Sequence, residues 1–218
     1  MRALLLLAAV LLPVLASAWP ARAQTPAVPG QCAAPAEENQ GRPGCFLTAE
    51  LRIADAPANL SWHLYGFADE PRARAEAGRH PHSLVSRSHG RIWLHVLSAQ
   101  AVRIRGGRRL ARVDGLRVRP GADLTVRFIE SVFPAGMRTR VHAHPGPEAF
   151  YVVDGVQCME TPQERRMVRA GQTFVVPPGA HVQASPSGRR NIALVIHEQG
   201  QLWMTLATDW SPSGFCDG

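Results

Sequence analysis

Two histidines and a glutamate lie close together in the middle of the chain, and all three carry side chains that bind divalent metals. His142 and His144 are separated by one residue, and Glu148 follows them after a Pro-Gly-Pro turn. Residues two apart in an extended strand point to the same face, so both imidazoles are expected on one side. Imidazoles with a carboxylate suit Fe, Mn, Ni, Cu or Zn and leave positions open to water, oxygen or substrate. The segment therefore predicts a divalent transition-metal site.

Short strands are the elements that would position these side chains. Runs of β-branched and aromatic residues recur between turn signals such as Asp-Gly and Pro-Gly, and one short helix is expected over residues 69–78. This spacing predicts an all-β fold, an antiparallel sandwich or barrel. The expected strands cover residues 91–97, 101–105, 110–113, 116–118, 124–133, 149–153, 156–160, 166–169, 173–176, 181–184, 191–197 and 202–207.

The first residues have the layout of a secretory signal peptide. Arg2 precedes an apolar run over residues 3–15, and the small residues that follow end in Ala21-Arg22-Ala23. The run is shorter than the roughly 20 apolar residues that span a bilayer, so cleavage is favoured over a stable membrane anchor. Cleavage after Ala23 is expected, with Ala18 as the alternative. The predicted organisation is a signal peptide (1–23), an extended N-terminal segment (24–60) and one barrel domain with additional N-terminal strands (61–218).

The positive charge of the chain does not indicate nucleic-acid binding. The formal net charge is +7 and every cation is arginine, which fits a coding bias better than selection for phosphate contacts. In the arginine-rich segment 103–119, arginines alternate with apolar residues, as in half-buried strands with one solvated face. Interleaved aromatic residues that would stack on bases are missing from it. No nucleic-acid partner is expected.

The four cysteines predict two disulfides if the chain is exported to an oxidising compartment. Four cysteines allow three pairings. Cys32 and Cys45 bracket a loop rich in proline and glycine that a local bridge would tie down, which would leave Cys158 and Cys216 as the second pair. No CxxC spacing is present, so a metal role for the cysteines is disfavoured. His95 and His197 lie within apolar strands and are expected to be hydrogen-bonded core or rim histidines.

The segment from Gly136 to Gly155 resembles the first motif of the cupin superfamily, G(X)5HXH(X)3–4E(X)6G. Every fixed position is present. The resemblance implies a cupin-type antiparallel β-barrel, also called a double-stranded β-helix or jelly roll, with His142, His144 and Glu148 as metal ligands. A looser resemblance, carried by GPEAFYVVDGVQCMETP and the terminal ATDWSPSGFC, is to bacterial exported single-cupin proteins and supports the Cys158–Cys216 pairing.

The second cupin motif, G(X)5PXG(X)2H(X)3N, is matched in part by residues 171–185. Gly171, Pro177 and Gly179 fit, His181 arrives one residue early, and Ser185 stands near the expected asparagine. A bulge or strand slip would bring His181 into the site as a fourth ligand, since one residue of slip reverses the face of a side chain. The alternative is that His181 lines the rim.

Three residues near the ligands are predicted to contact a substrate. Arg140 shares strand parity with His142 and would bind a carboxylate through its guanidinium. Gln183 shares parity with His181, and Phe150 shares parity with Glu148 and would form an apolar wall together with Val152.

Two functions follow from the resemblance. Cupins with two histidines and a glutamate are commonly dioxygenases, isomerases or related lyases, which implies a metal-dependent enzyme acting on a small organic molecule. The alternative is a non-catalytic module that binds a small ligand or a metal, because a fold does not determine function. A barrel without metal is a third reading. A homodimer formed through sheet edges is compatible with the sequence, and export would place the protein in the periplasm or outside the cell.

Overall fold

The computed structural model describes residues 32, 35–36 and 41–217, so the predicted signal peptide lies outside the described residues. One helix, α1 (Glu70–Ala77), accompanies the strands. The strands are β1 (Gly44–Ile53), β2 (Asn59–Phe67), β3 (Ser83–Ser88), β4 (Arg91–Ser98), β5 (Arg108–Arg117), β6 (Leu124–Phe133), β7 (Met137–Arg138), β8 (His142–His144), β9 (Glu148–Glu160), β10 (Arg165–Arg169), β11 (Thr173–Val176), β12 (Gly179–Ser185), β13 (Arg189–Glu198) and β14 (Thr205–Leu206).

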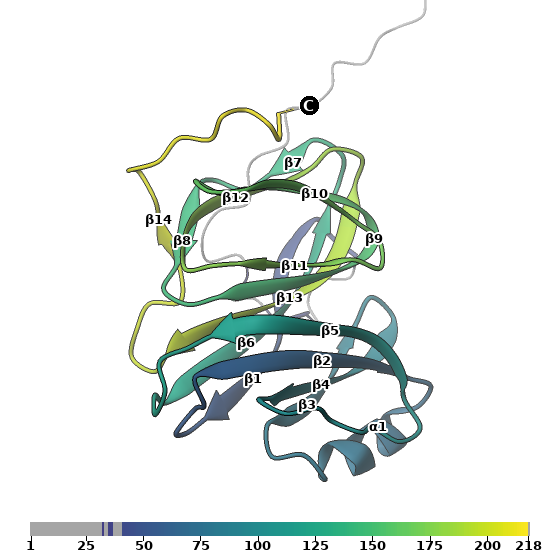
Figure 1. Cartoon of the computed structure of the whole chain (residues 1–218). Helices are drawn as coiled ribbons and strands as arrows, with labels where there is room; N and C mark the ends of the chain where they lie inside the picture. The colour runs from purple at the N-terminus through teal and green to yellow at the C-terminus, as the bar shows by residue number, and fades with distance from the viewer. Residues whose placement is uncertain (1–31, 33–34, 37–40, 218) are drawn as a thin grey trace, which may run out of the picture.

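Ten strands form one curled antiparallel sheet. Their order is β1-β6-β13-β9-β12-β8-β14, with β10 and β11 also pairing with β9 and β7 pairing with β12. The sheet curls so that β11 and β13 face β10 and β12 across an interior (Figure 1). This arrangement is the cupin-type jelly-roll barrel that the sequence predicted, and the prediction of an all-β fold is confirmed.

Strand β9 belongs to both halves of the barrel. Its first residues pair with β11 and β13, and its last residues pair with β10 and β12. The strand changes partners at Gly155, where φ is +75° and a Cβ atom would lie 2.0 Å from the carbonyl oxygen of Gly188. Only glycine fits this left-handed, crowded position. The two strands predicted over 149–153 and 156–160 are therefore one strand that passes through the motif glycine.

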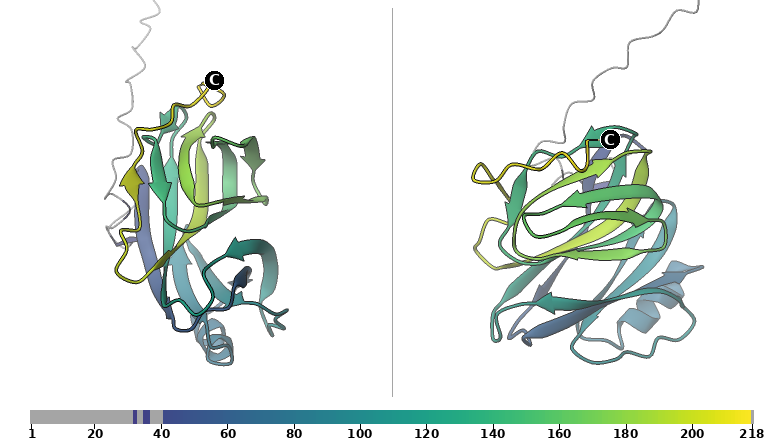
Figure 2. Two further views of the ribbon diagram at one scale, coloured as in Figure 1. Left: turned by 60° about the vertical axis from the view of Figure 1, so that its left-hand side comes forward. Right: turned by 45° about the horizontal axis from the view of Figure 1, so that its top comes forward.

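A second sheet of four strands packs on the outside of the barrel. Its order is β3-β4-β2-β5, and Figures 1 and 2 show it beside the barrel together with α1. Trp62 and Trp93 from this sheet share one apolar core with barrel residues such as Tyr151. Alternate residues of β9, among them Phe150 and Val152, face the barrel interior instead. Burial on both faces explains the continuous apolar run AFYVV at the start of β9.

The structure differs from the predicted strands elsewhere too, and the strands predicted over 110–113 and 116–118 are one strand, β5. Strands β1, β2 and β3 lie upstream of Arg91, where no individual strand was predicted, and β1 pairs with β6 inside the range assigned to an extended N-terminal segment. The strand predicted over 101–105 is wrong, because Val102 and Ile104 lie in a loop whose side chains pack on Tyr65, which produces the alternation without a partner strand. The strand predicted over 202–207 shortens to β14.

The predicted helix and both predicted disulfides are confirmed. Helix α1 begins after Asp69, whose carboxylate accepts a hydrogen bond from the backbone N–H of Arg72. Cys32 is bonded to Cys45 and Cys158 to Cys216. Two disulfides fit an oxidising compartment. Helix α1 has eight residues, and none of the described helices has the length and apolarity needed to cross a bilayer.

His95 joins β4 to its neighbours through a buried hydrogen-bonded ring, as expected for a core histidine. The indole N–H of Trp62 donates to His95 Nδ1 at 3.2 Å, and His95 Nε2 lies 2.9 Å from Ser86 Oγ. Nδ1 is therefore an acceptor and Nε2 carries the hydrogen, which is the neutral form of the ring. Burial lowers the pKa of His95 to about 3 from an ordinary value of 6.5.

We expect this histidine to make stability fall in acid. Between pH 6.5 and about pH 3 the unfolded chain binds a proton on His95 that the folded chain does not, so the free energy of unfolding decreases as the pH falls through this window. Urea unfolding at pH 7.5 and pH 4.5 tests this on wild type and His95→Gln, since glutamine can accept from Trp62 and donate to Ser86 without titrating. The variant should lose less stability than wild type; equal losses would contradict the assignment. His82→Gln, at a partly exposed position, is the control and should behave as wild type.

Candidate metal centre

Four buried side chains from three strands converge inside the barrel. His142 and His144 come from β8, Glu148 begins β9, and His181 comes from β12. Their nitrogen and carboxylate oxygen atoms all lie within 4.8 Å of one another. Two metal bonds of about 2.0–2.2 Å allow nearly this span, so a small adjustment brings all four onto one ion.

Strand register places His181 in this group. In the antiparallel pair of β12 and β8, His181 lies directly opposite His142, and Gly179 lies opposite His144. Residues directly opposite each other share a face of the sheet, so His181 points to the same side as both histidines of β8. The one-residue displacement in the second motif therefore does not remove His181 from the site; the ring centroids of His142 and His181 are 4.2 Å apart.

Backbone carbonyls fix the orientation of all three imidazoles. His142 Nδ1 lies 2.8 Å from the carbonyl oxygen of Arg140, His144 Nδ1 lies 2.7 Å from that of Trp203, and His181 Nδ1 lies 3.4 Å from that of Gly179. A carbonyl oxygen only accepts, so each Nδ1 carries the hydrogen. Each Nε2 is then left with a free lone pair. This is the arrangement in which metal-bound histidines are held by their surroundings.

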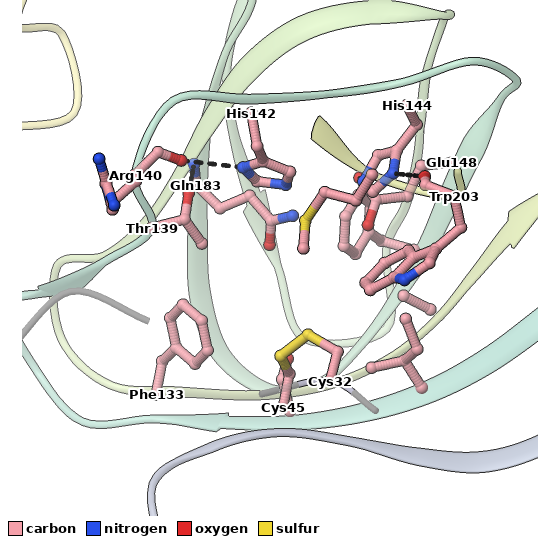
Figure 3. A pocket seen from close by; sticks show the side chains of 15 residues that line it. Cys32, Cys45, Phe133, Thr139, Arg140, His142, His144, Glu148, Gln183 and Trp203 are labelled. Carbon is pink, nitrogen blue, oxygen red and sulfur yellow. Dashed lines mark hydrogen bonds and ion pairs between the residues drawn. A yellow bond between two sulfur atoms is a disulfide. The ribbon is translucent and has the colours of Figure 1, made fainter. Parts of the chain in front are cut away.

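The carboxylate of Glu148 lies among these Nε2 atoms. Glu148 Oε2 is 3.0 Å from His181 Nε2. It is 3.5 Å from His144 Nε2, the contact drawn as a dashed line in Figure 3. None of these three atoms has a hydrogen-bond partner, although all are buried. Buried polar atoms without partners are costly, and here they are lone-pair donors aimed at one point. A divalent cation would satisfy them together, so the residues fit a metal site.

Burial also places the ligands in the protonation state that a metal requires. It lowers the pKa of His142, His144 and His181 to about 4 in each case. The imidazoles are therefore neutral near pH 7, and a metal need not displace protons from them. Burial raises the pKa of Glu148, which makes this carboxylate the group whose ionised form most needs a positive partner.

The Pro-Gly-Pro turn sets the position of Glu148. Gly146 packs so closely on β13 that a Cβ atom would lie 2.1 Å from the carbonyl oxygen of Ile196. The next residue, Pro147, accepts a hydrogen bond of 3.0 Å from the N–H of Ile196. Glu148 then enters β9 opposite Val195. Glycine at position 146 therefore allows the close approach to β13 that positions the carboxylate of Glu148.

A cavity of about 40 Å³ opens beside the ligands and contains all three predicted substrate contacts in its wall. Phe150 and Gln183 lie in the wall, whereas Val152 belongs to the apolar cluster behind it. Arg140 is exposed at the edge, and its guanidinium points away from His142 (Figure 3). Contact of these residues with a substrate stays a prediction.

Two parts of the wall come from segments distant in sequence, and no local signal in the sequence indicates them. The disulfide Cys32–Cys45 lines the cavity opposite the histidines (Figure 3). Trp203 lines it from the loop before β14 and stacks on His144, with ring centroids 5.5 Å apart and planes inclined by 20°. Arg127 covers Trp203, its guanidinium carbon 4.9 Å from the ring centroid. The loop therefore holds His144 by both ring and carbonyl.

Comparison with known proteins gives partial likenesses. No protein family matches the sequence, and no curated protein matches it. Among solved structures, a DMSP lyase is 20% identical over 38% of this chain and 44% of its own, with a TM-score of 0.34. A cupin-2 domain protein from Shewanella frigidimarina is 18% identical over 34% and 71%, with a TM-score of 0.29. Salicylate 1,2-dioxygenase from Pseudoaminobacter salicylatoxidans, with gentisate, is 18% identical over 35% and 24%, with a TM-score of 0.30.

The matched region thus spans less than half of the DMSP lyase, and overlaps of this size bear on neither activity nor substrate. The cupin-type fold of the chain rests on its own strand order and on the placement of its motif residues.

We expect Gly146→Ala to damage both the fold and the site. The added methyl group would clash with the carbonyl of Ile196, which should lower the free energy of unfolding by roughly 2–4 kcal/mol and displace Glu148. Chemical denaturation and metal titration measure the two effects. Gly78→Ala is the matched control, because φ there is −58° and the nearest atoms to a new Cβ lie at 3.8 Å. A Gly146→Ala protein as stable as wild type would contradict the role of the turn.

Proposed function

We propose that this chain is an exported metal-dependent enzyme of the oxygenase or isomerase type that acts on a small organic molecule. The observation that carries the proposal is the convergence of three buried imidazoles and the Glu148 carboxylate, whose ligand atoms lie within 4.8 Å of one another, while each Nδ1 is bonded to a backbone carbonyl. His142, His144, Glu148 and His181 would hold a divalent ion, with Fe, Mn, Ni, Cu and Zn all compatible with this ligand set.

The residues of the chain would bind, orient and shield the substrate. A bound ion would supply Lewis acidity or oxygen activation. Apolar wall residues such as Ile129, Phe150 and Ala193 keep water from the reacting end of a ligand. Gln183 and Thr139 offer polar groups at the wall that would orient it. These features support a small, partly apolar substrate placed directly beside the ligands.

A second function, a non-catalytic module that binds a small ligand or a metal, is favoured by one feature of the cavity. Among its described wall residues, the ionisable side chains are three of the metal ligands and Arg140, whose side chain is exposed. None of the described residues of this wall is a separate general base beside the ligands. The volume of about 40 Å³ also requires the wall to open before a larger molecule enters.

The proposed setting is the periplasm or the exterior of the cell. Both disulfides support it, and the predicted signal peptide would direct the chain there. We also propose that two copies of the chain form a homodimer through their sheet edges. Neither a nucleic-acid partner nor a stable membrane anchor forms part of this function.

Metal analysis of the protein purified without a histidine tag tests the proposal. We expect close to one divalent ion per chain in wild type. His142→Ala, Glu148→Ala and His181→Ala should each lower metal affinity by about tenfold or more, because each removes one ligand from a buried set. His82→Ala, outside the barrel interior, should retain the metal.

A wild-type protein that binds none of the five ions Fe, Mn, Ni, Cu and Zn would contradict the proposal. If the metal is present, oxygen-consumption and isomerase screens with small organic acids and phenols separate the two functions. Turnover that is lost in Glu148→Ala would support the enzyme. Binding without turnover across the screen would favour the module.

A further inference from the structure

Arg189 is a buried cation directly behind the wall of the metal cavity. Arg189 is the first residue of β13 and is 3% exposed. One guanidinium nitrogen, Nη1, donates to Ser131 Oγ at 2.8 Å, and Nη2 donates to Gln183 Oε1 at 2.9 Å. The guanidinium carbon lies 4.0 Å from the centroid of the Phe133 ring. All three of these neighbours line the cavity, so one layer of side chains separates the guanidinium from it.

None of the partners of Arg189 is an acid. Ser131, Gln183 and Phe133 are neutral, and the Nε atom of the guanidinium has no hydrogen-bond partner. Within the described chain, Arg189 forms no ion pair with a carboxylate at contact distance. Burial lowers the pKa of Arg189 to about 9, which leaves the group charged at neutral pH. An isolated buried charge of this kind is costly unless something compensates it.

Burial lowers the pKa of Arg189, and the charge of Glu148 acts in the opposite direction and raises it. Gln183 lies between the two groups in the sense that it lines the same cavity as Glu148 and contacts the guanidinium. Arg189 has only donors, so the amide oxygen of Gln183 must face it. Without a metal, the negative charge of Glu148 balances the positive charge of Arg189.

A divalent metal would upset this balance. The three imidazoles are neutral, so the single carboxylate would face both the metal and the guanidinium. Two positive charges would then lack an anionic partner in a site from which water is largely excluded. The apolar and amide groups of the wall cannot supply a negative charge. The missing charge must come with whatever occupies the open metal positions.

We propose that the cavity takes a small anionic ligand, of the carboxylate class, at the metal, and that Arg189 is the residue that selects for its negative charge. This inference rests on the proposed metal site and names the chemical class of its ligand. It also moves the carboxylate-recognition role from Arg140, whose exposed guanidinium points away from His142, to a buried residue of β13. Because Arg189 acts through the wall, it contributes electrostatic attraction and no direct fork-like contact.

The test uses the cobalt-loaded protein, whose visible spectrum reports ligands at the metal, and two probes of equal shape. Acetate carries the charge and acetamide does not. We expect acetate to perturb the spectrum with a dissociation constant at least tenfold lower than that of acetamide. Arg189→Met should raise the acetate constant by about tenfold and leave the acetamide constant unchanged, since a buried charge partner is removed.

Two further variants keep the inference falsifiable if Arg189→Met folds poorly. Arg189→Lys retains the charge and should restore acetate binding to within a few-fold of wild type. Arg140→Met removes the exposed charge at the rim and should leave the acetate constant unchanged. Cobalt content and thermal stability of every variant are measured first, so loss of metal is not mistaken for loss of selectivity.

Three outcomes would overturn the inference. The first is acetamide binding as tightly as acetate in the wild type. The second is a folded, cobalt-replete Arg189→Met that binds acetate as wild type does. The third is an Arg140→Met that carries the whole effect. A wild type that takes up no cobalt or other divalent ion fails at the earlier step and contradicts the proposed metal site itself. The cobalt measurement therefore distinguishes the two failures.

Discussion

The structure of the site depends on three hydrogen bonds from imidazole Nδ1 atoms to backbone carbonyls. These bonds hold His142, His144 and His181 in one tautomer, and the Nε2 atoms of His144 and His181 lie 3.5 and 3.0 Å from Glu148 Oε2. The carbonyls of Arg140 and Gly179 each lie two residues before the histidine that they bind. The carbonyl of Trp203 lies 59 residues after His144 in the sequence. Strand pairing between β8 and β12, the tight turn at Gly146 and the loop that carries Trp203 all serve this one orientation.

The cost of this orientation explains why a charged occupant is expected. Lone pairs of His144, His181 and Glu148 are buried without hydrogen-bond partners, and such groups destabilise a fold unless something satisfies them. A cation does so for the ligands, and Arg189 behind the wall then turns the pocket positive. Metal site and anion preference are therefore two consequences of one charge distribution, in which Glu148 is the shared acid.

Local patterns predicted the all-β fold, the helix and the favoured disulfide pairing, and the resemblance to the cupin motifs added the barrel with His142, His144 and Glu148. For His181 the rim stayed an alternative, which the register of β12 against β8 removes. Alternation within short strands and the motif glycines carry that information, since the motif glycine Gly155 occupies a position that no other residue fits. Contacts between distant segments were not predictable in this way. The folding of the chain brings three distant parts of the sequence to the site: Trp203, Arg189 and the disulfide Cys32–Cys45. The alternation at Val102 and Ile104 misled because packing of a loop on a sheet produces the same period as a strand.

X-ray absorption spectroscopy at the edge of the bound metal tests the four-ligand centre most directly. The account predicts three imidazole nitrogens and one carboxylate oxygen at about 2.0–2.2 Å, with any further scatterers being light oxygen atoms in the open positions. Fewer than three imidazoles would show that His181 or a histidine of β8 points elsewhere. A shell dominated by sulfur, or by oxygen alone, would contradict the centre.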